Sequence, residues 1–274
     1  MTRKLAPLTT HSRKPACSVP VRGVLHTLSG DKAITWQVPE EVPVAFVING
    51  ENFAVMMATP QDLEDFAAGF ALTEGVVKDA SDITGLLILP EGAGFSVELA
   101  MAEDRLDPSR LAKRGLEGRS GCGLCGVAAM ADVIRLPQAK PPSTELLPQA
   151  VARAYEALPR FQPMAEVNRT VHAAAWCAPD GTIRLAREDV GRHNALDKLI
   201  GALARDGTAG RQGFVLMSSR CSFELVQKCA LAGIGALATV SAPTALALDL
   251  AARAQVKLAA LAQSGVMIFE GAAP

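Results

Sequence analysis

Aromatic side chains are scarce in this sequence, and neither sign of charge is in excess. Phe, Trp and Tyr make up 4% of the 274 residues, and 27 Lys and Arg stand against 28 Asp and Glu, for a net charge of −1. Proteins that bind nucleic acids normally carry a basic excess, and single-strand binders stack bases on aromatic rings. We therefore expect no nucleic-acid partner. Hydrophobic residues, at 49%, indicate instead a folded core over most of the chain.

We expect neither a secretory signal nor a membrane helix. Residues 1–20 carry four basic side chains but no apolar stretch, which is typical of a flexible basic tail. Residues 229–248 contain no charge and are long enough to span a bilayer. This run divides better into a helix end, a strand and another helix start, because four turn-favouring residues interrupt it: Gly233, Gly235, Ser241 and Pro243. The protein is expected to be cytoplasmic, with reduced thiols and no membrane partner.

Proline marks one boundary within the chain. Residues 137–148 contain four prolines and several polar neighbours, a composition that favours an extended linker. This linker would separate an N-terminal part, residues 21–136, from a C-terminal part, residues 149–274. The length of the chain suits one large domain or two small ones.

Strand-like runs open the N-terminal part. Residues 33–38 alternate apolar and polar side chains, and residues 42–49 are apolar and β-branched. Asn49-Gly50 is a strong hairpin turn, which makes residues 53–58 the expected partner strand.

A helix is predicted to follow these strands. Thr59 suits its N-cap, Pro60 its first turn and Gly75 its stop. Strands and helix together predict a small mixed α+β domain.

The C-terminal part alternates strand-like and helix-like segments. This alternation favours an α/β fold with three layers, in which helices cover a sheet. The predicted strands are residues 182–186, 213–217, 235–240 and 266–269, and the predicted helices are residues 195–204, 222–232 and 244–254.

The sharpest local signal is a pair of cysteines in a glycine-rich loop. Cys122 and Cys125 form a Cys-x-x-Cys between Gly118 and Gly126, and a helix is predicted at residues 127–136. The positive end of that helix favours the thiolate, which is the nucleophilic form of cysteine. Glycine on both sides of the thiols lets the loop present them to two different partners.

The residues alone leave three interpretations of this pair open. A structural zinc site needs four ligands, and the other four cysteines are scattered singly along the chain. A thioredoxin-like redox pair would directly follow a strand, which the glycine-rich lead-in does not match. A nucleophilic or sulfur-carrying cysteine fits best. We expect no permanently bound metal.

Charged side chains crowd a second segment, residues 187–198. Asn194 can act as a helix N-cap with Asp197 in the first turn, which is a purely structural interpretation. It does not account for four side chains at the carboxyl end of the preceding strand, where open α/β sheets bind ligands: Glu188, Asp189, Arg192 and His193. We therefore expect a ligand site there rather than a solvated turn.

A third segment, residues 218–228, follows an apolar strand and leads into a helix. Hydroxyl groups, a guanidinium and the N–H groups of a helix start together favour phosphate or pyrophosphate. Cys221 and Cys229 are expected to be small core residues. The candidate ligands are Ser218, Ser219, Arg220 and Ser222, the last of which could be only a helix cap.

One further side chain, His172, precedes the apolar run Ala173–Trp176. A lone histidine at such a place is either a satisfied core residue or part of a site, and both interpretations stay open. The sequence has no His-x-Glu near Cys122 and Cys125, so a zinc deaminase signature is absent.

Taken together, these segments resemble the FdhD family of formate dehydrogenase accessory sulfurtransferases. The resemblance covers the chain from about Glu41 onward. Its ordered blocks are Glu41-Val-Pro-Val, Asn49-Gly50, Met56 to Pro60 with Asp62-Leu63-Glu64, Gly69-Phe70 with Glu74-Gly75, Gly118 to Gly126, His172-Ala-Ala-Ala, Glu188 to Lys198, Ser218 to Lys228 and Ser241-Ala-Pro-Thr244.

The resemblance implies that the protein carries sulfur. In the family, a cysteine desulfurase loads a persulfide onto a loop cysteine. The sulfur then passes to the molybdenum bis(molybdopterin guanine dinucleotide) cofactor, which serves formate dehydrogenase. Cys122 would be the carrier and Cys125 an assisting thiol. A homodimer is also implied, as is a cytidine deaminase-like three-layer C-terminal domain with a smaller mixed α+β N-terminal domain.

The same resemblance implies a cofactor-binding set for the GDP-like nucleotide moiety. Its members are Ser218, Ser219, Arg220, Ser222, His172, Asp189, Arg192, His193, Leu261, Ala262, Gln263, Ser264, Gly265 and Val266. Two segments depart from the family pattern. Asn168-Arg-Thr-Val replaces a Thr-Gly-Gly-like stretch, and Ala260–Val266 lacks the usual Gly-Phe and the basic residue after it. The alternative functions are a dithiol oxidoreductase and a non-enzymatic cofactor chaperone.

Overall fold

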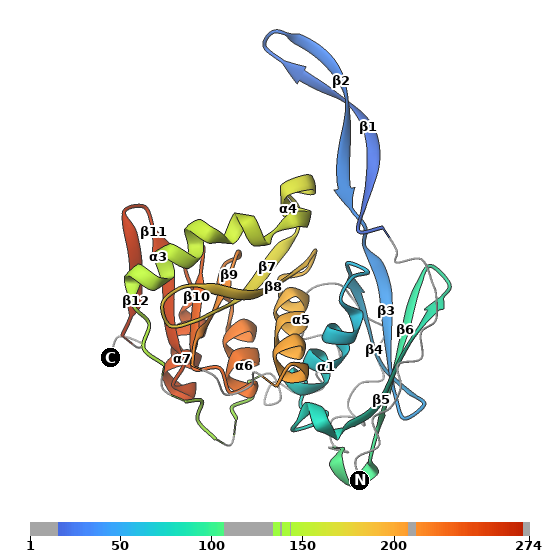
Figure 1. Ribbon diagram of the computed structural model, residues 1–274, viewed down its shortest axis with the longest axis vertical. Helices are drawn as coiled ribbons and strands as arrows, with labels where there is room; N and C mark the ends of the chain where they lie inside the picture. Colours follow the sequence, from blue (N-terminus) through green and yellow to red (C-terminus); the bar gives the residue numbers. More distant parts are fainter. Residues whose placement is uncertain (1–15, 107–133, 138, 143, 208–211, 271–274) are drawn as a thin grey trace.

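Three separate sheets make up the fold (Figure 1). The structure is a computed structural model and describes residues 16–106, 134–137, 139–142, 144–207 and 212–270. Cys122 and Cys125 therefore lie outside the described residues.

The smallest sheet is a long hairpin, which we call the arm, residues 18–39. It pairs β1 Ser18–Thr27 with β2 Gly30–Pro39 along their whole length and extends away from the rest of the described chain (Figure 1). The strand predicted at residues 33–38 is confirmed within β2. The sequence analysis missed β1, which begins inside the range assigned to the flexible tail, because Pro20 and Gly23 weaken its strand signal.

The four-stranded sheet belongs to the N-terminal part and has the order β4-β3-β6-β5. The Asn49-Gly50 turn joins β3 to β4 as predicted, with φ angles of 48° and 86°. Two 3-10 helices, η1 Ala80–Asp82 and η2 Glu103–Arg105, flank β5 and β6. The strands are β3 Val42–Ile48, β4 Glu51–Ala58, β5 Ile83–Glu91 and β6 Gly94–Met101.

The six-stranded sheet belongs to the C-terminal part and has the order β12-β11-β10-β9-β7-β8. Strands β9, β10 and β11 run parallel, whereas β7 is antiparallel to both β8 and β9, and β12 is antiparallel to β11. The strands are β7 His172–Cys177, β8 Ile183–Asp189, β9 Phe214–Met217, β10 Ala236–Thr239, β11 Lys257–Ala262 and β12 Gly265–Phe269.

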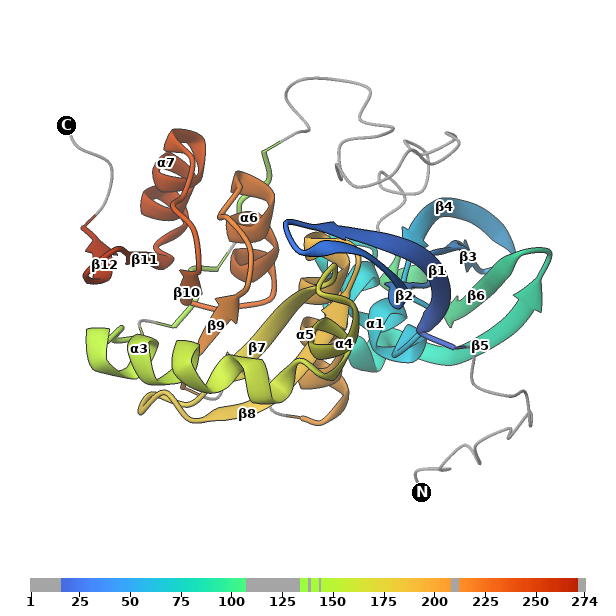
Figure 2. The same cartoon turned by 90° about the horizontal axis from the view of Figure 1, so that it is seen from above.

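Helices cover both faces of this sheet, which confirms the predicted α/β class and its three layers (Figure 2). One face packs against α3 Pro148–Ala157, and η4 Leu158–Phe161 and α4 Pro163–Asn168 continue from it. The other face packs against three helices, α5 Arg192–Arg205, α6 Phe223–Leu231 and α7 Ala245–Ala254. The division into two domains at residues 137–148 stays a prediction.

Helix α1, Leu63–Thr73, connects the two larger sheets. Its Phe66 and Phe70 pack on Phe46 of the four-stranded sheet. Its other side crosses α5 with the two backbones in contact. A Cβ atom on Gly69 would lie 1.8 Å from the carbonyl oxygen of Asp197, and one on Gly201 would lie 1.9 Å from that of Asp65. No side chain can occupy either position, so the crossing requires glycine on both helices.

Several predicted element ends are wrong. Helix α1 begins at Leu63 after Asp62, so Thr59 is not its N-cap. Helix α5 begins at Arg192, three residues before the predicted start. Residues 134–136, at the end of a predicted helix, are irregular. Strand β11 was missed because its alanine-rich sequence has a low β-propensity. The start of α7 is confirmed, since the Thr244 hydroxyl accepts a hydrogen bond from the N–H of Ala247.

The charge-free run at residues 229–248 divides as predicted into the end of α6, strand β10 and the start of α7. Across the described part of the chain, no helix is long and apolar enough to cross a membrane.

We predict that Gly69→Ala destabilises the protein by about 2 kcal/mol or more, because a methyl group would collide with the Asp197 carbonyl and push α1 off α5. Urea unfolding followed by circular dichroism would measure the loss. Gly265→Ala is the matched control, since a Cβ there meets no atom within 4 Å. Equal stability of the two variants would contradict the tight crossing.

Candidate functional site

Three strands bring predicted site residues to one edge of the six-stranded sheet. Strands β8 and β9 end there, and β7, which runs in the opposite direction, begins there. The register pairs His172 with Asp189, and the N–H of Ala173 donates to the Ser218 hydroxyl at 2.8 Å. This is the carboxyl edge at which the sequence predicts ligand binding.

Two helices also begin at this edge. Helix α5 follows Gly191 and α6 follows Ser222, and neither start has a side-chain cap hydrogen bond. The Ser222 hydroxyl lies 3.5 Å from Nε2 of His193, in the first turn of α5, so the two helix starts are neighbours. First-turn N–H groups and the helix dipole both favour an anion. We call His172, Ser218, Ser219 and these two helix starts the edge site.

The loop between β9 and α6 presents its predicted ligands unequally. Ser219 is buried and its hydroxyl donates to the Arg220 carbonyl at 3.0 Å, whereas the Arg220 side chain is exposed. The N–H of Ser241 donates to the Ser219 carbonyl, and the N–H of Thr244 donates to the Cys221 carbonyl. These bonds fix the loop against the connection between β10 and α7.

His172 is half-buried at the edge site. Burial lowers its pKa below the ordinary value of 6.5, the positive charge of Arg192 lowers it further, and Asp189 opposes both effects. The imidazole is therefore neutral at pH 7. An arriving anion would offset the repulsion from Arg192, so His172 can take up a proton as the anion binds.

A second polar pair lies at the start of α6. Nε2 of His193 is 3.9 Å from Oε2 of Glu224, and both side chains are largely buried. Oε2 of Glu224 accepts no hydrogen bond in the described structure. The sequence analysis missed Glu224, although its place in the first turn of a predicted helix was a usable signal.

The carboxylate of Asp189 is fully buried and shared among four donors. Its Oδ1 accepts from the N–H of Gly191 at 2.8 Å and from Nδ2 of Asn194 at 2.9 Å. Its Oδ2 accepts from the N–H of Thr59 at 3.0 Å and pairs with Nζ of Lys198 at 2.6 Å. Asp189 thereby fixes the start of α5, and its predicted contact with a cofactor stays a prediction.

Thr59 and Asn194, which were predicted as helix caps, bind across the molecule instead. The Thr59 hydroxyl accepts from the N–H of Val190, and its carbonyl accepts from Lys198. Nδ2 of Asn194 also donates to the Met57 carbonyl. Local spacing suggested caps because the same polar groups serve both purposes. These contacts attach the N-terminal part to the edge site.

A parallel network lies one helical turn further along α5. Nζ of Lys228 binds both oxygens of Asp197 and the Thr73 hydroxyl, each at 2.9 Å, and lies 3.5 Å from Glu74. Burial raises the pKa of Asp197, and the charge of Lys228 opposes that rise. The capping role predicted for Asp197 is therefore wrong.

Arg135 attaches the chain to this network. Its guanidinium donates to the backbone carbonyls of Thr73 and Glu74 and pairs with the Glu74 carboxylate at 3.1 Å. Its backbone N–H donates to Gln227 of α6. Arg135 follows the Cys-x-x-Cys by ten residues, so the described chain resumes at a fixed anchor.

Glu188 supports the neighbouring helix. Its carboxylate accepts from the N–H groups of Met164 and Ala165, the first two available donors of α4. Burial raises its pKa, and these two bonds limit the rise. Glu188 is thus a helix cap supplied from a distant strand.

The comparisons with known proteins agree with this geometry. The model of the FdhD/NarQ family matches residues 39–272. The chain belongs to this family. Sulfur carrier protein FdhD of Chromobacterium violaceum is 48% identical over 242 residues, covering 86% of this chain and 89% of that protein. Sulfur carrier protein FdhD of Bordetella petrii is 46% identical over 222 residues, covering 81% and 80%. The predicted family is confirmed.

A solved structure shares the fold of this FdhD/NarQ chain. It comes from Desulfotalea psychrophila and is described as a formate dehydrogenase accessory protein. The TM-score is 0.75 at 24% sequence identity, with 94% of this chain and 98% of that chain covered. The mixed α/β fold with several sheets is confirmed, and its likeness to cytidine deaminases stays a prediction.

The two segments that depart from the FdhD pattern have different places. Asn168 ends α4, where its Oδ1 accepts from the N–H of Thr170 and its Nδ2 donates to Ser18 at the base of the arm. Residues 261–266 form the turn between β11 and β12, at the same sheet edge as Ser218 but two strands away from β9. The structure therefore brings the edge site together without joining this turn to it directly.

The described cysteines are mostly core residues in this FdhD/NarQ chain. Burial raises the pKa of Cys177 and of Cys221 to about 12 and raises that of Cys229. The core role predicted for Cys221 and Cys229 is confirmed, because their exposed fractions are 1% and 0%. Cys17 is partly exposed, and its thiol donates to Gln61.

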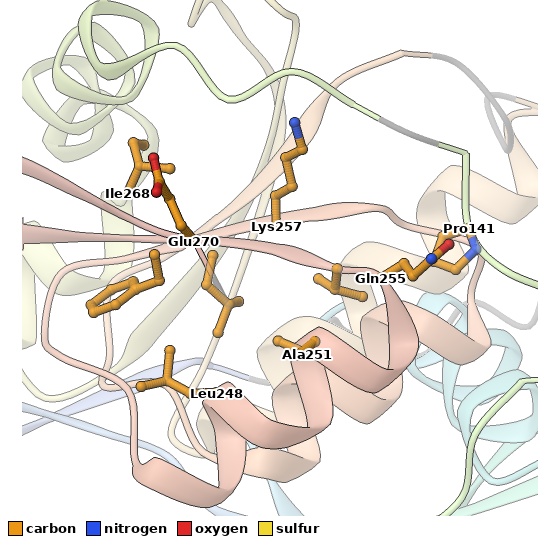
Figure 3. Close-up of a pocket in the computed structure, with 11 residues that line it drawn as sticks. Pro141, Leu248, Ala251, Gln255, Lys257, Ile268 and Glu270 are labelled. Carbon is orange, nitrogen blue, oxygen red and sulfur yellow. The ribbon is translucent and has the colours of Figure 1, made fainter. Parts of the chain in front are cut away.

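Metal binding and the main cavity were also considered. Within the described ranges, no group of three or more His, Cys, Asp or Glu side chains could hold a metal. A cavity of about 510 Å³ lies between α7 and the β11–β12 hairpin, with Leu248, Phe269 and Lys257 among its lining residues (Figure 3). It opens at the sheet edge opposite the edge site, where β11 begins, so it is separate from the predicted ligands.

We predict that Lys198→Met lowers the free energy of unfolding by about 3–5 kcal/mol, because it leaves the buried Asp189 carboxylate without its counter-charge. Denaturant unfolding would measure the change. Lys257→Met, at an exposed lysine, should stay within about 0.5 kcal/mol of the parent protein. Adding Asp189→Asn to Lys198→Met should recover part of the loss. A single variant as stable as the parent would contradict the buried pair.

A further prediction concerns pH. The folded pKa of His172 is lowered, so the unfolded chain binds its proton first as the pH falls below about 6.5. Stability should therefore decline in that range, by up to about 1.4 kcal/mol per pH unit for one proton. In His172→Asn this slope should flatten. His26→Asn, on the exposed arm, should keep it. An unchanged slope in His172→Asn would count against the burial of a neutral imidazole.

Proposed function

We propose that this chain takes a persulfide sulfur from a cysteine desulfurase and delivers it to the molybdenum bis(molybdopterin guanine dinucleotide) cofactor for formate dehydrogenase. The main support is that relatives 46–48% identical over more than four-fifths of the chain are named sulfur carrier protein FdhD. The cofactor is the substrate of this reaction, and its sulfur ligand is what the protein supplies.

Cys122 is the proposed carrier. Its thiolate attacks the terminal sulfur of the desulfurase persulfide, so a new S–S bond forms on Cys122 while the old one breaks and the desulfurase cysteine leaves as a thiolate. Such an attack needs a thiol that ionises near neutral pH. The raised pKa values of the buried Cys177, Cys221 and Cys229 make them unsuited to this step. Cys125 assists or resolves the persulfide.

The edge site is the proposed place for the phosphate groups of the guanine dinucleotide. Two neighbouring helix starts supply backbone N–H groups and positive dipole ends. Arg192 and Arg220 add positive charge at the same edge, and Ser218 and Ser222 add hydroxyl groups. Uptake of a proton by His172 would increase the positive charge when the phosphate binds. The turn at residues 261–266, which has no basic side chain, would make a lesser contribution.

We further propose that the protein works as a homodimer in the cytoplasm, with a cysteine desulfurase and formate dehydrogenase as partners. A carrier that meets both must expose its thiol to two different proteins in turn. Glycines on both sides of Cys122 and Cys125 suit this requirement.

We predict that incubation with a cysteine desulfurase and L-cysteine adds the mass of one sulfur atom to the protein. Intact-mass spectrometry should show the adduct on the parent chain and on Cys125→Ala, but not on Cys122→Ala. Cys17→Ala is the control for a partly exposed thiol elsewhere and should keep the adduct.

Two results would overturn the proposal. Without an adduct, a reversible Cys122–Cys125 disulfide with disulfide reductase activity would identify a dithiol oxidoreductase. If Cys122→Ala still activates formate dehydrogenase while Arg220→Ala does not, the protein is a cofactor chaperone that needs no carrier thiol.

A further inference from the structure

The two faces of the arm differ sharply in polarity. Directly paired residues of an antiparallel hairpin lie on the same face. One face therefore carries Val19 with Val38, Val21 with Trp36, and Gly23 with Ile34. The opposite face carries Ser18, Pro20, Arg22, Val24 and His26 with their partners Pro39, Gln37, Thr35, Ala33 and Asp31. We call the first of these the apolar face of the arm.

The apolar face is left open to solvent. Every residue from 21 to 33 is exposed, and the exposed fractions of Val21 and Trp36 are both 46%. In Figure 1 the arm leaves the body of the described chain and extends beyond it. Contacts hold only its base, where Asn168 donates to Ser18 and the N–H of Glu40 donates to the Cys17 carbonyl.

An isolated arm of this kind is poorly stable by itself. A two-stranded hairpin is at best marginally stable in water, and an amphipathic sheet needs another layer against its apolar face. Both outer edges of the arm also present unpaired backbone groups, because its sheet has no third strand. The arm is thus complete only when another surface covers it.

We propose that the apolar face of the arm lies on a second copy of this chain, in a two-fold dimer in which each arm embraces the partner. This inference rests on the homodimer of the proposed function and assigns its contact surface. Trp36, at the middle of the face, is the expected anchor, since large aromatic side chains dominate binding energy at interface centres.

The area of the arm fits a stable dimer of this geometry. A ten-residue strand extends about 33 Å, and two paired strands are about 10 Å wide. Two arms, each lying on a partner, would cover four such faces, on the order of 1,300 Å² in total, which is within the range of about 1,200–2,000 Å² for specific interfaces. A one-sided contact would cover only half of this.

The chemistry of the face also favours a permanent contact with a second copy. Apart from Lys32, opposite Leu25, it has no charged side chain. Homodimer interfaces are more apolar than those of partners that come and go. Reciprocal exchange also closes the assembly at two copies, so no apolar face remains to recruit a third.

The test compares Trp36→Glu with Thr35→Glu in the full chain. Both add one negative charge to β2 at neighbouring exposed positions, but Thr35 lies on the opposite face. Sedimentation equilibrium should show dimers for the parent protein and for Thr35→Glu. For Trp36→Glu the dimer dissociation constant should rise by at least about 30-fold. Trp36 fluorescence in the parent should shift to the red on dilution, while the buried Trp176 stays constant.

Two outcomes would overturn the inference. If both variants dimerise like the parent, the dimer uses another surface, and if the parent protein is a monomer at all concentrations, the arm binds something other than a second copy. Sulfur loading of Cys122 is measured on the same samples. Its failure would contradict the proposed function while leaving the dimer result standing, so the two ideas fail separately.

Discussion

The contact between α1 and α5 at Gly69 and Gly201 is the constraint on which the rest of the structure depends. Because the two backbones touch, the side chains that flank the crossing are pressed together away from water. Two buried lysines approach the aromatic rings of α1, Lys198 over Phe66 and Lys228 over Phe70, each 5.8 Å from the ring centre. Each lysine also pairs with a carboxylate of the C-terminal part. Directional bonds thus fix a register that apolar packing alone would leave free to slide.

These pairs explain how an edge rich in acidic residues can still receive a phosphate. Glu188, Asp189 and Asp197 lie in or beside the segment that leads into α5, yet each carboxylate is turned inward. Glu188 caps α4, and the two aspartates neutralise buried lysines. What remains on the outside is the start of two helices, hydroxyl groups and guanidinium groups. The negative charge is used in holding the fold, and the positive potential is left for the ligand.

The alternation of strands and helices in the C-terminal part, the Asn49-Gly50 hairpin and the anion-binding character of residues 218–222 could be predicted, because each depends on local periodicity or turn chemistry. The roles of Thr59 and Asn194 could not. Both have the residue type of a cap, but their partners lie more than 100 residues away, at Asp189 and at Met57. Lys198 and Lys228 looked like ordinary helix-surface residues, since nothing near them in sequence indicates a buried partner. Cys122 and Cys125 remain known from sequence alone.

The crossing also has a consequence for synthesis of the chain on the ribosome. Thr59 and Asp189 are separated by 130 residues. At about 5–20 residues per second, translation leaves α1 without α5 for roughly 6 to 26 s. During that interval the four-stranded sheet can form with α1 upon it, but the far side of α1 shows its bare glycine groove and the carboxylates of Asp65 and Glu74 without their basic partners. The nascent N-terminal part must therefore tolerate water on a surface that the finished protein never exposes, and this favours polar groups over a continuous apolar stripe along that side of the helix.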